Sequence, residues 1–256
     1  MPTITITRTT TRTMSTEASQ NASSQSIFSQ NGFSQNPLLH LLHLATPALP
    51  VGAFSYSEGL ETLVQQGNLT HQEALSHWLS AELQVGAIRL EAIALLQAYR
   101  CVRQGDQPGL RHWNEWLSAF RETEELREQS WQMGRALVRL LREILPATIS
   151  DLDACGDRCN FAIAFAIAAA HWQIAEAEVV AGYLHSWATN LVNAGVKLIP
   201  LGQTQGQKVL IGLYPILDRA TQEVLLQTAD DLYSCSWGLA IASMNHETLY
   251  SRLFRS

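Results

Sequence analysis

The sequence has few charged residues and almost no lysine. Charged residues make up 16% of its 256 residues, and among the 17 basic residues only Lys197 and Lys208 are lysines. With 23 acidic residues, the formal net charge is −6. An acidic balance argues against non-specific nucleic-acid binding, which requires a basic surface.

Cysteines and long apolar runs are also scarce. Four cysteines in 256 residues are too few for a disulfide scaffold. Residues 1–36 lack the apolar stretch of a secretory signal peptide. We therefore expect free thiols and a reducing, cytoplasmic location. No run reaches the roughly 18 apolar residues that cross a membrane, so no membrane span is expected.

The first 36 residues differ in composition from the rest. Thr, Ser, Gln and Asn dominate them, and their apolar residues are isolated. Such a segment cannot bury enough apolar area to offset its loss of conformational entropy. We predict a disordered tail over residues 1–36. Two alternatives stay open: the basic first residues are compatible with a transit peptide, and Met14 could be the start.

From Pro37 onward, apolar residues recur mostly at helical spacing. Pro37 suits a first helical turn, and Pro47 and Pro50 would end that helix. Further helices are predicted over about 70–104 with a break or bend at Gly86, 110–145 with a break near 118–120, 176–196, 204–214, 221–227 and 230–244. The helices over 70–104 and 204–214 would open with the capping boxes Thr70 with Glu73 and Thr204 with Gln207.

One further segment is ambiguous by periodicity. Phe161 to Ile167 alternates large apolar residues with alanine, which is typical of a strand. Because alanine is the best helix former and a poor strand former, we predict a buried helix. With no convincing strand pair elsewhere, the predicted fold is all-α. We expect a single-domain bundle of roughly eight to ten helices over 37–245, followed by a short segment over 246–256.

The sequence lacks the motifs of common enzymes. Gly202 to Lys208 has the wrong glycine spacing for a phosphate-binding loop, and no Ser or Thr follows the lysine. Ser55 and Ser57 lack the glycines of a nucleophile elbow. His246 and Glu247 have no second histidine four residues on.

Other clusters of ionisable residues suggest structural roles. His40 with His43, and Cys155 with Cys159 if their stretch is helical, could each share a metal, but both pairs lack further ligands at short spacing. We favour packing roles for them. We interpret one charged run as a solvated, ion-paired helix face; it comprises Arg121, Glu122, Glu124, Glu125, Arg127 and Glu128. No residue is assigned to catalysis, a metal or a cofactor.

Three segments carry residues that are unusual for plain helix linkers. In 49–61, a Pro-Val-Gly turn would present Phe54 and Tyr56, unless the aromatics fold inward. In 190–210, Lys197 stands alone in an apolar run, so its charge must reach solvent, pair or meet a partner. The segment 246–256 has aromatic and arginine residues typical of interface hot spots, unless it packs on its own domain.

At these segments the sequence resembles the urease accessory protein UreF family. The resemblance covers residues 38–256. Four ordered blocks carry it: ALPVGAFSYSEGLE (48–61), RETEELREQSWQMGRAL (121–137), NLVNAGVKLIPLGQTQGQ (190–207) and SMNHETLYSRLFRS (243–256). Ala53 departs from a frequent family glycine, and Gly195 from a common alanine.

The resemblance implies an all-helical homodimer without catalytic activity or a cofactor of its own. It implies an adaptor between the scaffold protein UreD, also called UreH, and the GTPase UreG. These proteins act in GTP-dependent nickel insertion into the urease apoprotein, and the partners handle nickel and GTP. By the same resemblance, Gly52, Phe54, Tyr56 and Lys197 would lie at the UreG-facing or dimer-facing surface. The segment that orders against UreD would contain Tyr250, Arg252, Leu253 and Phe254.

Two alternative functions stay open. A GTPase-activating regulator of UreG would insert an arginine, such as Arg121 or Arg135, into the nucleotide site. A metallochaperone would itself carry nickel through His40, His43 or the cysteines.

Overall fold

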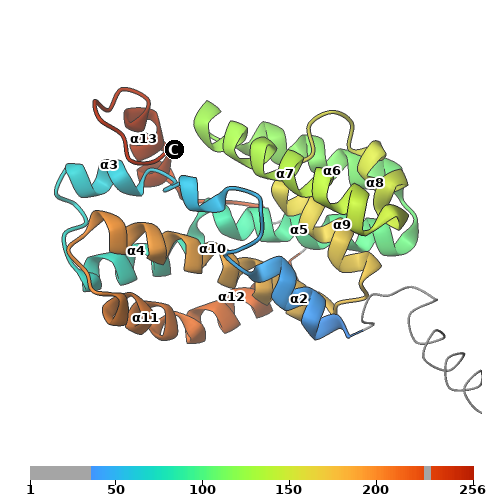
Figure 1. Cartoon of the computed structure of the whole chain (residues 1–256), viewed down its shortest axis with the longest axis horizontal. Helices are drawn as coiled ribbons and strands as arrows, with labels where there is room; N and C mark the ends of the chain where they lie inside the picture. The colour runs from blue at the N-terminus through green and yellow to red at the C-terminus, as the bar shows by residue number, and fades with distance from the viewer. Residues whose placement is uncertain (1–35, 228–231) are drawn as a thin grey trace, which may run out of the picture. The chain divides into compact units, whose positions relative to one another are not determined.

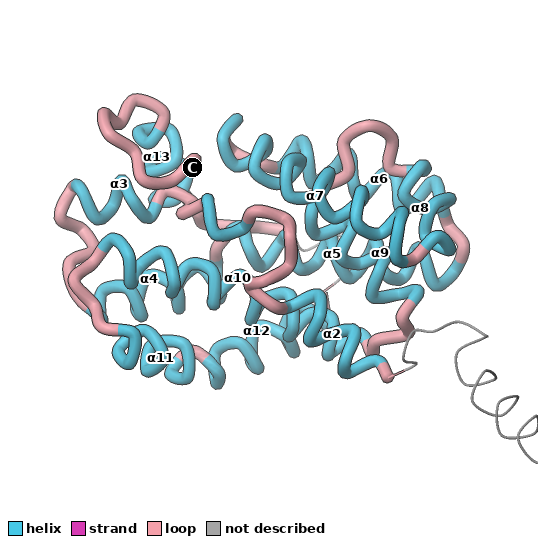
Figure 2. Tube along the Cα trace, in the orientation of Figure 1, coloured by secondary structure: helices cyan, strands magenta, loops and turns pink. Residues whose placement is uncertain are grey.

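A computed structural model describes residues 36–227 and 232–256. Every regular element in these residues is a helix, and none of them is a strand (Figures 1 and 2). The all-α prediction is confirmed. The predicted disordered tail over 1–36 lies outside the described residues, except for Asn36.

The helices follow one another along the chain. They are α2 (Pro37–Ala45), α3 (Leu60–Gln65), α4 (Gln72–Val85), α5 (Ala87–Gln104), α6 (Gln107–Phe120), α7 (Glu124–Ile144), α8 (Ile149–Ala154), α9 (Phe161–His171), α10 (Glu176–Leu198), α11 (Gln203–Gly212), α12 (Tyr214–Leu226) and α13 (Trp237–His246), with short 3-10 helices η1 (Ala53–Ser55) and η2 (Pro146–Thr148). None of the helices in the described part of the chain is long and apolar enough to cross a membrane.

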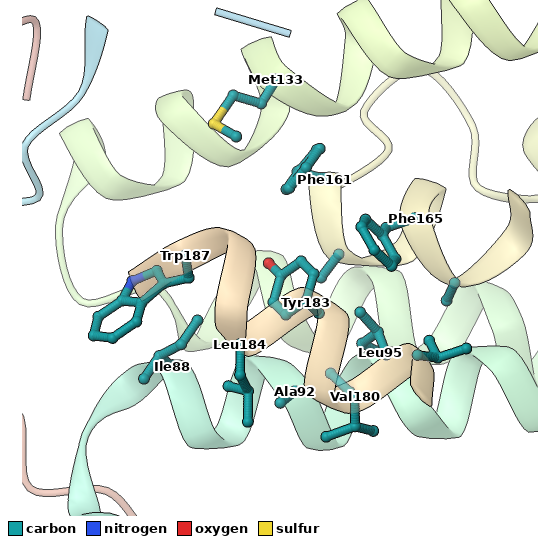
Figure 3. Packing of buried hydrophobic residues seen from close by; sticks show 14 of the residues in the cluster. Ile88, Ala92, Leu95, Met133, Phe161, Phe165, Val180, Tyr183, Leu184 and Trp187 are labelled. Carbon is teal, nitrogen blue, oxygen red and sulfur yellow. The ribbon is translucent and has the colours of Figure 1, made fainter. Parts of the chain in front are cut away.

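The core is built around α9, which packs against α5 and α7. All residues from Phe161 to Ala170 are buried, so the alternating segment is a buried helix as predicted. Phe161 and Phe165 lie against Tyr183 of α10, with ring centroids 5.9 and 5.3 Å apart (Figure 3). The alanines between them let α5 and α7 approach closely, because a methyl group occupies little space.

Several predicted helix boundaries were wrong by a few residues. The break at Gly86, one of the two alternatives predicted there, is confirmed, since Gly86 has an extended backbone with a φ of −85° and a ψ of 177° between α4 and α5. The N-caps are His71 and Gly202 rather than the two predicted threonines. At Gly202, the side chain of Gln205 accepts the N–H at 2.8 Å, so the helix begins earlier than expected.

Three other boundaries also differ from the prediction. The break between α6 and α7 comes after Phe120, where Thr123 caps α7 by accepting the N–H of Leu126 at 3.2 Å. Helix α12 starts at Tyr214, because a proline in its first turn favours initiation there. Helix α13 starts at Trp237, and residues 228–231 of the predicted helix lie outside the described residues.

Candidate partner-binding surface

The loop before α3 presents one aromatic side chain and buries another. Gly52 has a φ of 77°, in the left-handed region that glycine adopts without strain, and η1 follows directly. Phe54 in η1 is 66% exposed. Tyr56 is buried, and its hydroxyl donates to Oε1 of Gln132 at 2.8 Å. Of the two aromatics expected at the surface, only Phe54 is available to a partner.

The carboxy-terminal segment lies against this loop (Figure 1). The N–H of Arg255 donates to the oxygen of Ser55 at 2.8 Å. The hydroxyl of Ser57 donates to the main-chain oxygen of Ser256 at 2.7 Å, and the N–H groups of Ser57 and Glu58 donate to the same oxygen. The segment therefore packs on its own domain, the alternative left open by the sequence.

The docked segment turns some predicted docking residues outward and others inward. Phe254 is buried, whereas Tyr250 and Leu253 are 96% and 64% exposed. Arg252 is exposed and donates to Oε1 of Glu125 at 2.9 Å. Of the predicted docking residues on this segment, Tyr250, Arg252 and Leu253 thus remain accessible.

A group of ionisable side chains, of which only Glu61 and His246 are fully buried, holds the segment in place. We call it the clasp, and it consists of Glu61, Glu125, His246 and Arg252. The His246 ring is fully buried, with Nε2 3.3 Å from Oε2 of Glu61 and Nδ1 3.0 Å from Oε2 of Glu125. The clasp joins α3, α7 and α13 to the carboxy terminus, and the sequence reasoning missed it.

Lys197 of α10 contacts the carboxy-terminal segment. Its Nζ lies 5.5 Å from the ring centroid of Phe254, a cation–π distance. The residues expected to face two different partners are thus adjacent. We call the exposed set the loop–tail surface; its members are Phe54, Lys197, Tyr250, Arg252 and Leu253.

Behind the loop, the charged side chains Glu58, Glu91 and Arg121 line a cavity, which we call the chamber. Glu58 has a φ of 51°, and its carboxylate accepts from Nε2 of Gln129 and Nε1 of Trp187, each at 2.9 Å. Nearby, Arg121 forms a buried ion pair with Glu91. Burial raises the pKa of Glu58, and the positive charge of Arg121 opposes that rise.

The chamber is small. Its volume is about 50 Å³, and its lining includes Glu58, Arg121 and Asn190. The Nε of Arg121 is buried and has no hydrogen-bond partner among the described residues. A cavity that holds one water needs roughly 10–15 Å³, so this space suits a few water molecules bound to its polar walls.

The chamber and the clasp correct the interpretation of the charged run after α6. Arg121 is buried, and Glu125 contacts both His246 and Arg252. Arg121 and Glu125 therefore do not belong to a solvated face, whereas Glu124 is exposed as expected. Glu125 and Gln129 lie one helical turn apart and face the carboxy-terminal segment. Polar residues at inward-facing positions of a helix were the available signal.

The candidate metal ligands have other contacts. His40 stacks on Trp172 at 4.6 Å, and His43 meets the same ring edge-on at 6.3 Å. Cys155 and Cys159 are buried, and their stretch is not helical, so they share no helical face. The neighbouring Cys155 thiol and burial raise the pKa of Cys159 well above its usual value. Across residues 36–227 and 232–256, no three His, Cys, Asp or Glu side chains are grouped to hold a metal ion.

The fold and the site define an all-helical protein with an exposed surface of aromatic, aliphatic and basic side chains, the kind used in protein–protein interfaces. The family model described as UreF matches residues 69–214. The chain belongs to the urease accessory protein UreF family.

Curated relatives match most of the chain. The urease accessory protein UreF of Trichormus variabilis is 58% identical over 218 residues, which cover 85% of this chain and 95% of the relative. That of Microcystis aeruginosa is 58% identical over 219 residues, covering 86% and 97%. The more distant protein of Chromohalobacter salexigens is 39% identical over 219 residues, covering 86% and 94%.

Proposed function

We propose that this chain acts in urease maturation as a homodimeric, cytoplasmic adaptor without catalytic activity. In this proposal it bridges the scaffold protein UreD and the GTPase UreG during GTP-dependent nickel insertion into the urease apoprotein. The chain holds no cofactor of its own, and its partners handle nickel and GTP.

The observation that carries this proposal is the loop–tail surface. Phe54, Tyr250 and Leu253 are large apolar side chains held exposed, with Lys197 and Arg252 among them. Aromatic and arginine residues dominate binding energy at interfaces, and single large apolar residues on a fixed backbone lose little entropy when bound. UreG would use the Phe54 side of this surface, and UreD the side formed by Tyr250 and Leu253.

The test is to mix the purified chain with UreD and UreG, and to measure the mass of the complexes by light scattering with and without GTP. We expect a complex containing two copies of this chain with both partners. A chain that remains a lone monomer in both mixtures would refute the adaptor role.

A double substitution tests whether Tyr250 and Leu253 contribute to UreD binding. Because Tyr250 and Leu253 are exposed, Tyr250→Ala with Leu253→Ala should leave the fold intact. We expect UreD affinity to fall at least about tenfold, as for two truncated hot-spot residues. Titration calorimetry measures the loss. Leu226→Ala is the matched control, since this residue is 82% exposed on α12, and it should bind as the unchanged chain does. Unaltered affinity in the double variant would exclude the tail from the UreD interface.

A further inference from the structure

We propose that the outer side of α7 is a second interaction surface, which binds an acidic segment of a partner protein. We call this surface the arginine face; its members are Arg127, Trp131, Arg135, Arg139 and Arg158. It is separate from the loop–tail surface, and the inference does not depend on the proposed function. It adds a partner of stated chemistry to those already named.

Two guanidinium groups lie against one indole ring on this face. Cζ of Arg158 is 4.3 Å from the centroid of the Trp131 ring, and Cζ of Arg127 is 6.0 Å from it. Both distances are within the range of cation–π contacts. A guanidinium that stacks on a ring keeps its N–H groups, which lie in its own plane, available to another acceptor. The ring therefore holds two sets of donors that a ligand can use.

Hydrogen bonds to the interior fix the indole ring in this position. Nε1 of Trp131 donates to Oγ of Ser118 at 3.1 Å. The same oxygen accepts from Nδ2 of the fully buried Asn160 at 2.8 Å. Nδ2 of Asn114 donates to the carbonyl oxygen of Arg158 at 2.8 Å, which anchors the main chain of the second arginine. Because these groups are already held in place, less conformational entropy is lost when a ligand binds.

The arginines of this face have no acidic partner in the chain itself. Across residues 36–227 and 232–256, no carboxylate forms an ion pair with any of them. By contrast, Arg142 at the end of the same helix pairs with Asp153. The whole chain has a formal net charge of −6, so this side of α7 is a positive area on an acidic molecule. Such an area attracts a segment of negative charge.

Most of the face follows the helix axis in a row. Arg127, Trp131, Arg135 and Arg139 are each four residues apart, which places them along one side of α7. At 1.5 Å per residue, the row is about 18 Å long. Arg127 follows Glu125 by two residues, a rotation of about 200° around the helix. The row and the carboxy-terminal segment that Glu125 contacts therefore lie on different sides of α7.

The hollow beside the row indicates which kind of anion fits. Its volume is about 720 Å³, it lies between α6, α7 and the connection after α8, and its lining includes Glu115 and Asp157. These carboxylates would repel a chain of phosphates, whereas they can accept the main-chain N–H groups of a peptide. Guanidinium groups bind carboxylate side chains through two parallel hydrogen bonds. The mixed charge therefore favours an acidic polypeptide over a nucleic acid or an anionic membrane.

The first experiment measures binding of an acidic peptide to the full-length chain. The probe is a fluorescein-labelled peptide in which glutamate and alanine alternate, and fluorescence anisotropy gives its dissociation constant. The comparisons are the same peptide with lysine for glutamate, and a single-stranded DNA with the same number of negative charges. We expect the acidic peptide to bind, the DNA to bind more weakly and the lysine peptide not to bind. No binding of the acidic peptide, or DNA binding that is as tight, would overturn the proposal.

Paired substitutions locate the binding on the arginine face. Arg127→Gln with Arg158→Gln removes both stacked guanidinium groups, and neither residue is fully buried, so the fold should persist. We expect the dissociation constant of the acidic peptide to rise at least about tenfold, as for two charge-assisted contacts.

The control for this variant removes the same charge elsewhere. Arg103→Gln with Arg219→Gln changes exposed residues of α5 and α12, and the dissociation constant should stay within about threefold of that of the unchanged chain. Equal weakening in the two double variants would mean that only the net charge matters, and would overturn the proposal.

A further variant separates the ring from the charges. Trp131→Leu keeps every arginine and removes the ring on which two of them lie. We expect binding of the acidic peptide to weaken by about threefold or more, with an unchanged urea midpoint. Unaltered affinity would show that the ring does not position the arginines, and would count against the proposal.

Discussion

Glu82 shows how a single buried carboxyl can link three elements. It lies near the end of α4, where Ser236 donates to its Oε2 at 3.2 Å. The same serine hydroxyl accepts the N–H of Ala87 at 2.6 Å, at the start of α5. Burial raises the pKa of Glu82 to about 7, and the hydrogen bond from Ser236 opposes that rise.

This pKa predicts how stability changes with pH. Between about 4.5 and about 7 the unfolded chain has lost the Glu82 proton and the folded chain retains it. The folded state binds more protons there, so the free energy of unfolding decreases as pH rises through this window, and the contribution of Glu82 is constant above it. Glu82→Gln should lessen that decrease, because the amide still accepts from Ser236 and does not ionise.

Urea unfolding of both chains at pH 4.5, 6 and 8 measures the effect. Relative to the unchanged chain, Glu82→Gln should become more stable as pH increases. Glu124→Gln, at an exposed acid of α7, is the control. Its free energy of unfolding should change with pH as that of the unchanged chain does. A stability difference that is independent of pH would contradict the prediction.

At the scale of elements, α13 is attached by close backbone approach and by few apolar contacts. Leu239 packs with Ala87 and Leu126 in a small separate cluster. Trp237, exposed by 76%, is one of the large apolar side chains on its outer face. Gly59, the N-cap of α3, has a φ of 75°, and a Cβ there would lie 3.0 Å from Cβ of Ala242. The short distance between α3 and α13 therefore depends on this glycine.

Two alanine substitutions separate backbone strain from this close approach. Gly52→Ala should cost about 1–2 kcal/mol, the strain of the left-handed region, because no atom lies within 4 Å of the added Cβ. Gly59→Ala bears the same strain and also pushes α13 outward, so it should cost about 1–3 kcal/mol more. Urea denaturation measures the loss of unfolding free energy in both variants. Equal losses would mean that α13 moves away from the added Cβ at no cost in stability.

At the scale of the whole molecule, the loop–tail surface assembles segments that are distant in sequence. The hydrogen bond from Leu253 to Glu61 spans 192 residues. Lys197 of α10 and Glu125 of α7 contact the same tail from other parts of the chain. Such a surface exists only in the folded chain, so partner binding and folding are coupled.

The arrangement bears on the alternative in which this chain supplies an arginine to UreG. Arg121 is buried in its pair with Glu91, whereas Arg135 is exposed on α7. An arginine finger contributes about 10³–10⁵ in rate. With Arg135→Ala, we expect the single-turnover rate of GTP hydrolysis by UreG to stay within about twofold of the rate with the unchanged chain, as for an adaptor. A loss of orders of magnitude would establish a catalytic contribution.

Much of the fold was predictable because helix formation depends mainly on residues that are close together in the sequence. The alternating segment from Phe161 was identified through alanine propensity, and the break at Gly86 through the weak helix propensity of glycine. Of the candidate site, the loop and the tail were predicted as separate segments. Their contact was not, since nothing in the local pattern around Ser55 or Arg255 indicates that they pair.

The sequence by itself determined the helical class, the approximate helices and the family, because periodicity, propensity and ordered motifs are properties of neighbouring residues. The tertiary structure decided which charges are buried and which aromatics are exposed. Arg121 and Glu125 belong to a run that looks solvated, and Tyr56 to a loop that looks exposed. Their environments come from Glu91, His246 and Gln132 on other helices, and a side chain's burial depends on such distant neighbours.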